Sequence, residues 1–241
     1  MSLLLYCICA TPALRQTPPP PPADVPVTLR WLDADDLAAL VAPAPVQDDV
    51  AAMLAFGDVI EHYHARLTVV PMRYGSRLSG PGAVVAHLTA DHDRYAALLE
   101  LLDGCVEMGL RLPLAPTAGG ARQAQDSAMS GRDYLLRRRA ELAVGAAAEA
   151  ALDRLDAALA GLFRRRRREQ GWFAGQQRLS VQYLVPRAVL DSFELRLQDA
   201  LAAGWLPGAP DAVLTSGPWP PYSFAAADTL AAFPTAVTSS P

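Results

Sequence analysis

The feature that most constrains the fold is an aperiodic segment near the middle of the chain. Residues 113–128 are rich in Pro, Gly, Ala and Gln, and they lack the hydrophobic repeat of a helix or a strand. The chain has 241 residues, which is long enough for two ordinary domains. The sequence therefore predicts a domain at residues 1–112, a linker at 113–128, a second domain at 129–224 and a flexible tail at 225–241.

The first domain is expected to alternate strands and helices. Asp33 is a suitable N-cap for one helix, and Gly104 is a suitable stop for another. A longer helix is expected to open at Asp48 or Asp49. Its apolar residues follow the helical repeat and predict this buried face: Val50, Met53, Leu54, Phe56, Ile60 and Tyr63. The expected strands are residues 3–9, 27–32, 68–70 and 106–112, and the expected helices are 33–42, 49–63 and 81–103.

The second domain is expected to contain one long helix. Strong helix formers continue from Gly131 to Arg168, so the arginine run at its end is predicted to be a solvated, cationic helix terminus. Residues 176–185 alternate as a strand, Pro186 suits the first turn of a second helix, and residues 211–216 form a last strand. Strands and helices interleave without a regular βαβ repeat, which predicts an α+β fold in both domains.

Charge and cysteine content narrow the class of protein. The net charge is −4, with 7 Arg against 13 Asp and Glu in residues 1–120, and 14 Arg against 12 in residues 121–241. No apolar run approaches the roughly 20 residues that span a bilayer, and the apolar start of the chain has no preceding basic residue. The three cysteines are too few for a secreted disulfide framework or a four-thiolate zinc site. We therefore expect a cytoplasmic protein with buried thiols.

Four segments, in this order along the chain, resemble the GvpF/GvpL family of gas vesicle proteins. They are Pro71–Gly75, Ser130–Leu135, Tyr183–Arg187 and Ser216–Phe224, and the last is the most specific. The resemblance implies two α+β domains, the second with a modified ferredoxin-like fold. It also implies an assembly factor or minor component of the gas vesicle, a cytoplasmic organelle that gives buoyancy. The implied partners are the shell protein and other accessory proteins, with no cofactor, nucleic acid or membrane.

Two of these segments supply the candidate partner-binding residues. In the last segment three prolines restrict the backbone, and the aromatic side chains of Trp219, Tyr222 and Phe224 can bury large areas. These side chains are expected either to cover the protein's own core, in which case Trp219 is mostly buried, or to contact a partner protein. Arg73 and Tyr74 follow an apolar strand, and the guanidinium needs a carboxylate such as Glu61 or Glu107, or else a partner.

Two alternative functions remain open from the residues alone. A small enzyme would use the cluster of His87, Asp91, His92 and Asp93, although no metal, nucleophile-elbow or phosphate-loop motif is present. A nucleic-acid binder would use the arginine runs 137–139 and 164–168 on one basic helix. Neighbouring acidic residues offset the positive charge of these runs, so no nucleic-acid site is predicted. Because no catalytic or metal-binding motif is present either, no catalytic or metal-binding residue is predicted.

Overall fold

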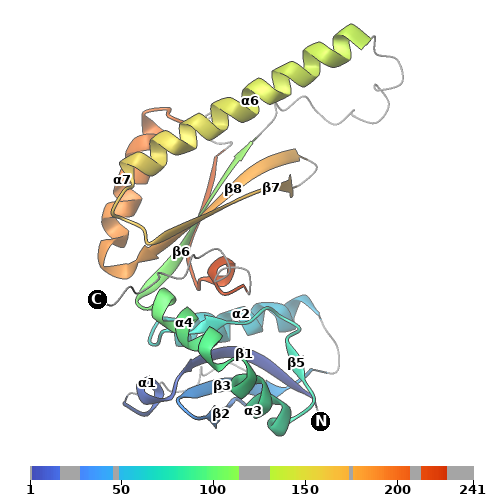
Figure 1. Cartoon of the computed structure of the whole chain (residues 1–241), viewed down its shortest axis with the longest axis vertical. Helices are drawn as coiled ribbons and strands as arrows, with labels where there is room; N and C mark the ends of the chain where they lie inside the picture. Colours follow the sequence, from blue (N-terminus) through green and yellow to red (C-terminus); the bar gives the residue numbers. More distant parts are fainter. Residues whose placement is uncertain are drawn as a thin grey trace, which may run out of the picture. The chain divides into compact units, whose positions relative to one another are not determined.

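The computed structural model describes residues 2–16, 28–45, 49–113, 131–173, 176–206 and 213–226 (Figure 1). The chain is mixed α and β, with two antiparallel sheets and helices, as the α+β prediction requires. The proline run at 18–22, almost all of the expected linker and the tail from residue 227 lie outside the described residues.

The chain contains two compact units whose limits differ from the expected domains. The first unit comprises residues up to Val106 together with those from Trp219, and the second comprises Glu107–Pro218. The difference arises from strand β6 (Cys105–Pro113), which the sequence analysis assigned to the N-terminal domain. In the structure β6 lies in the second sheet, between β8 (Gln176–Pro186) and β9 (Leu214–Trp219). The aperiodic segment that was expected to separate two domains therefore follows the first strand of the second unit.

The sheet of the first unit is built around strand β1 (Leu3–Ala10), whose first seven residues are all buried. Its strands run in the order β2-β3-β1-β4, and β5 also pairs with β1. A register shift between Leu5 and Cys7 places Cys7 and Cys9 on the same face as Leu4 and Tyr6. All three cysteines are buried and free, and burial raises the pKa of Cys9 to about 12. The other strands are β2 (Arg30–Ala34), β3 (Leu37–Pro43), β4 (Val70–Pro71) and β5 (Arg77–Leu78).

The predicted helix at residues 33–42 is wrong, because this segment forms a β-hairpin. Asp35 turns the chain with a positive φ of 54°, and Ala34 then pairs with Leu37 across the turn. Strand β3 is buried from Leu37 to Ala42 and pairs with β1 on one side and β2 on the other. A continuous apolar run of that length suits a strand with two neighbours, and this pairing outweighs the helical preference of its alanines.

The helices of the first unit partly follow the expected positions. Helix α2 (Val50–His64) begins as predicted, with the Asp49 carboxylate accepting a hydrogen bond from the Ala52 amide at 2.7 Å. The expected helix at 81–103 is divided at Asp91 into α3 (Pro81–Ala90) and α4 (His92–Leu102). Residues 11–16, for which the sequence predicted neither a helix nor a strand, form the short helix α1 (Thr11–Gln16).

The second unit has the element order β6-α6-β7-β8-α7-β9, and its strands lie in the order β7-β8-β6-β9. This βαββαβ order is that of ferredoxin-like units. Tyr183 on β8 hydrogen-bonds Asp156 of α6 and contacts the ring of Phe193 on α7, so both helices cover the same face of the sheet (Figure 1). The remaining bounds are α6 (Gly131–Ala158), β7 (Arg165–Phe173), β8 (Gln176–Pro186), a 3-10 turn (Arg187–Val189), α7 (Leu190–Ala202) and β9 (Leu214–Trp219).

The long helix ends ten residues earlier than the sequence predicted. Helix α6 stops at Ala158, Gly161 turns the chain with a φ of 83°, and the arginine run continues as strand β7. The strand pairs with β8 from Arg165 opposite Leu184 to Phe173 opposite Gln176. Hairpin pairing with β8 thus overrides the helix-forming tendency of arginine, a preference of only a few tenths of a kcal/mol per residue.

Candidate partner-binding surface

An aromatic cluster supports the candidate residues of the first unit. The rings of Tyr6 and Phe56 stack at 4.6 Å, and Tyr74 meets Phe56 edge-on at 5.4 Å. Tyr222 packs against the same core from the C-terminal segment. The structure therefore brings two of the predicted residues, Tyr74 and Tyr222, onto one hydrophobic cluster, although they are far apart in sequence.

Arg73 lies on a turn that presents its side chain to solvent. The amide and hydroxyl groups of Ser76 both donate to the Arg73 carbonyl, at 3.1 and 2.8 Å, and Gly75 takes the positive φ of 91° that the turn needs. The ion pair expected with Glu61 is not formed: within the described part of the first unit, the exposed Arg73 side chain has no carboxylate partner. The guanidinium is thus available on this turn.

The C-terminal aromatic segment is divided between core and surface. Phe224 is only 2% exposed and belongs to the core of the first unit. Trp219 is 48% exposed, so the prediction that its ring is mostly buried is wrong. A short 3-10 turn (Tyr222–Phe224) directs Phe224 inward. Nothing in the sequence distinguishes the two rings, because their separation depends on the three-dimensional path of the chain between them.

Helix α2 exposes apolar residues that the sequence analysis placed in its buried face. The buried side chains of the helix include Phe56, Val59, Ile60 and Tyr63, but its first two turns face solvent. Val50 is 67% exposed, Met53 48% and Leu54 61%. The sequence did contain a signal for this exposure. Val50 and Leu54 lie on the same helical stripe as the charged Glu61, and a charged residue on a stripe indicates that the stripe faces solvent.

The histidine–aspartate cluster forms two separate surface pairs. His87 lies 3.5 Å from Asp91, and its Nε2 shares a 2.7 Å hydrogen bond with the Tyr95 hydroxyl. His92 instead contacts Asp36 at 2.6 Å and Asp93 at 3.1 Å. The hydrogen bond to Asp36 is the main cause that raises the His92 pKa, and it lowers the Asp36 pKa in turn. Within the described ranges no group of three or more His, Cys, Asp or Glu side chains has an arrangement that could hold a metal ion.

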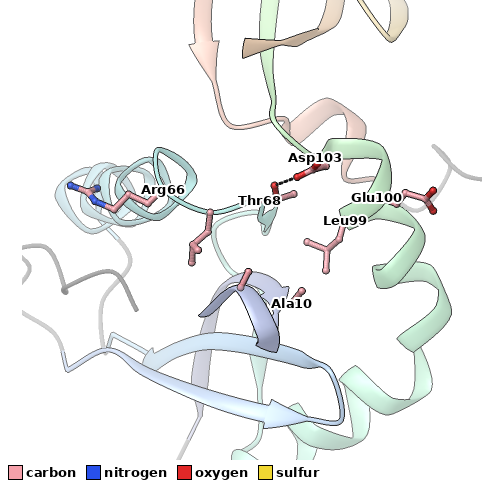
Figure 2. Close-up of a pocket in the computed structure, with 8 residues that line it drawn as sticks. Ala10, Arg66, Thr68, Leu99, Glu100 and Asp103 are labelled. Carbon is pink, nitrogen blue, oxygen red and sulfur yellow. Dashed lines mark hydrogen bonds between the residues drawn. The ribbon is translucent and has the colours of Figure 1, made fainter. Parts of the chain in front are cut away.

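A pocket of about 370 Å³ lies in the first unit, and its interior is mostly apolar (Figure 2). The Thr68 hydroxyl donates to the Asp103 carboxylate at 2.7 Å. Figure 2 shows the ends of Arg66 and Glu100 directed away from the space. The pocket therefore lacks the converging ionisable groups that the enzyme alternative requires. It is lined by Ala10, Ala13, Arg66, Leu67, Thr68, Leu99, Glu100 and Asp103.

The arginine run on β7 is paired with acidic residues. Arg168 forms ion pairs with Glu149, Asp153 and Asp156 of α6, at 2.7, 2.8 and 2.5 Å. Arg166 also contacts Asp156, and Arg167 pairs with Glu169 at 2.7 Å. The run therefore does not form the free basic helix on which the nucleic-acid alternative was based. The side chains of the earlier run, 137–139, lie outside the described part of the molecule.

Comparison with known proteins identifies the family. Residues 2–226 match the family model described as gas vesicle synthesis protein GvpL/GvpF. The chain belongs to the GvpL/GvpF family. A curated relative, gas vesicle protein L from Streptomyces sp. strain CB03234, is 33% identical over 170 residues. That match covers 65% of this chain and 62% of the relative.

Two solved structures have the same fold as this GvpL/GvpF family member. GvpF from Anabaena sp. PCC7120 superposes with a TM-score of 0.67 and 16% identity, over 93% of this chain and 98% of that one. GvpF from Microcystis aeruginosa gives a TM-score of 0.65 and 16% identity, over 93% and 99% of the two chains. These structures show the fold, and it is the family match that makes the chain a gas vesicle-associated protein. None of the helices in its described part has the length and apolar character needed to cross a bilayer.

Proposed function

We propose that this GvpL/GvpF protein is a cytoplasmic assembly factor or minor component of the gas vesicle, and that it acts by binding rather than catalysis. Its partners are the hydrophobic shell protein and other accessory proteins. The observation that carries the proposal is the exposed Trp219 in a chain that matches the gas vesicle family over residues 2–226. An exposed tryptophan with a polar N–H group is typical of residues that dominate protein interfaces.

The proposed binding surface consists of Arg73, Tyr74, Trp219 and Tyr222, which we call the Arg73 group. All four belong to the first unit. Arg73 and Trp219 are exposed, while Tyr74 and Tyr222 are half-buried against the core and give the surface a rigid base. Phe224 supports this surface from within the core and does not itself meet the partner.

The physical task of such a surface is to cover apolar area for a limited time. A hydrophobic shell subunit aggregates when a large apolar patch is exposed to water. Aromatic side chains and an arginine cover such a patch, because they combine a large contact area with groups that also tolerate water. The binding should be moderate in strength, since a subunit delivered to the growing wall must be released again.

Substitution of Trp219 tests the proposal. In cells that form vesicles and lack the native gene, Trp219→Ala should abolish or strongly reduce vesicle formation. Its free energy of unfolding should fall by at most about 1–2 kcal/mol, because half of the ring is already in water. Phe224→Ala is the matched control and should cost about 3–5 kcal/mol, as for other buried aromatic residues. Normal vesicle formation with Trp219→Ala would contradict the assigned surface.

A further inference from the structure

Helix α2 carries an exposed stripe that the Arg73 group does not include. We call it the α2 stripe, and its members are Val50, Met53, Leu54, Gly57, Asp58 and Glu61. We propose that the α2 stripe docks a basic amphipathic helix of the shell protein, with apolar side chains over its first half and an arginine or lysine at its acidic half. This inference rests on the proposed function, which supplies the partner.

The first half of the α2 stripe is an apolar surface on a firmly anchored helix. Val50, Met53 and Leu54 are 67%, 48% and 61% exposed, so most of their apolar area faces water. The opposite side of α2 is held in the core by Phe56 and Ile60, which are 3% and 0% exposed. The stripe therefore presents side chains in fixed positions, and a partner pays little additional ordering entropy to cover them.

The middle of the stripe allows a close approach. Gly57 lies between the apolar and acidic halves, and a Cβ atom built on it would meet no atom within 4 Å. A glycine in the interior of a helix costs roughly 0.5–1 kcal/mol relative to alanine, and nothing within the fold requires it here. The resulting notch gives room for a large side chain of the docked segment.

The acidic half determines the charge of the partner. Asp58 and Glu61 are exposed, and neither forms an ion pair with any described residue. The sequence of the whole first unit, residues 1–106 and 219–241, holds 6 Arg against 13 Asp and Glu, a net charge of −7. A docked segment with arginine or lysine beside its apolar residues complements this field, whereas an acidic segment is repelled.

A helix fits this surface better than a strand or a second copy of the chain. From Val50 to Glu61 the stripe is about 17 Å long and nearly straight along the helix axis, so a second helix can follow it for three turns. Two copies of the chain meeting through their stripes would bring four carboxylates into one interface without a basic stripe residue to neutralise them.

A pair of equally exposed leucines tests the apolar half. Leu54 and Leu195 are 61% and 62% exposed, on α2 and α7 respectively. In vesicle-forming cells, the tagged full chain with Leu54→Glu should recover about tenfold less shell protein than the wild type, as for the loss of an interface hot spot. Leu195→Glu should recover an unchanged amount. Equal recovery by wild type and Leu54→Glu would overturn the inference and leave the proposed function intact. No recovery by the wild type would contradict the proposed function itself.

Charge reversal and crosslinking test the rest of the proposal. The double variant Asp58→Arg, Glu61→Arg should recover less shell protein than the wild type. The control Glu100→Arg, which replaces an exposed acidic residue on α4, should recover an unchanged amount. A photo-crosslinking residue at position 54 should attach to a helical segment of the shell protein that contains Arg or Lys. Crosslinks to a second copy of this chain, to an extended segment or to another accessory protein would overturn the assignment.

Discussion

At the residue scale, the clearest titratable contact joins α4 to the β2–β3 turn. The ring of His92, which is partly exposed to water, contacts the exposed Asp36 carboxylate at 2.6 Å. The pKa of His92 is raised above its ordinary 6.5 mainly by this hydrogen bond, and that of Asp36 is lowered from 3.8. Because the folded state favours both the protonated histidine and the ionised aspartate, the pair contributes its full stability above pH 3.8 and below pH 6.5.

This linkage predicts a pH-dependent difference between the wild type and His92→Gln. The wild type should have the higher melting temperature at pH 5–6, and the difference should shrink as the pH rises through the folded pKa of His92. A difference in melting temperature that stays constant from pH 5 to pH 9 would show that the charge of His92 does not contribute to stability. The effect should also weaken in 0.5 M salt, since the pair is exposed.

Substitution of glycine by alanine is expected to change the free energy of unfolding in opposite directions at two positions. Gly217 has a φ of 115°, and a Cβ there would lie 2.6 Å from the Glu107 carbonyl oxygen. Gly217→Ala should therefore lower the free energy of unfolding by about 2 kcal/mol or more. Gly57→Ala, in the open interior of α2, should raise it by about 0.5–1 kcal/mol. Denaturant titration measures both, and equal effects would show that the close crossing of β6 and β9 is not fixed.

At the element scale, the contact between β7 and α6 depends on one arginine. The Arg168 side chain is 20% exposed and forms ion pairs with three carboxylates of α6. Arg168→Ala removes one cation from three neighbouring acids, so it should cost about 1–3 kcal/mol. Arg167→Ala breaks a pair with the 56%-exposed Glu169 and should cost less than about 0.5 kcal/mol. Urea unfolding that ranks the two variants equally would contradict this account.

The same elements show which parts of the fold can be predicted from sequence. Strand β1 and the start of α2 follow from local signals, namely a short apolar run and an aspartate N-cap. The segment Leu37–Pro43 does not, because its pairing with β1, far earlier in the sequence, decides its conformation. The segment Arg165–Phe173 does not either, because its hairpin with β8 outweighs the local helical preference. Of the candidate site, Arg73 and Trp219 were identified from their motifs, whereas the exposure of Val50 and Leu54 depends on how α2 packs.

At the scale of the whole molecule, the two units have opposite net charges. Residues 107–218 hold 15 Arg against 12 Asp and Glu, a net charge of +3, whereas the first unit carries −7. The first unit is also discontinuous in sequence, because the segment from Trp219 returns to it. The Arg73 group and the α2 stripe both belong to this acidic unit, which we therefore expect to receive the shell protein.

Co-purification tests the central claim most directly. The tagged full chain would be isolated from vesicle-forming cells, and the bound shell and accessory proteins would be quantified by mass spectrometry against an untagged strain. Our account predicts enrichment of the shell protein, with the amount reduced by the Trp219→Ala and Leu54→Glu substitutions and unchanged by Leu195→Glu. Recovery of no gas vesicle component with the wild-type chain would contradict it.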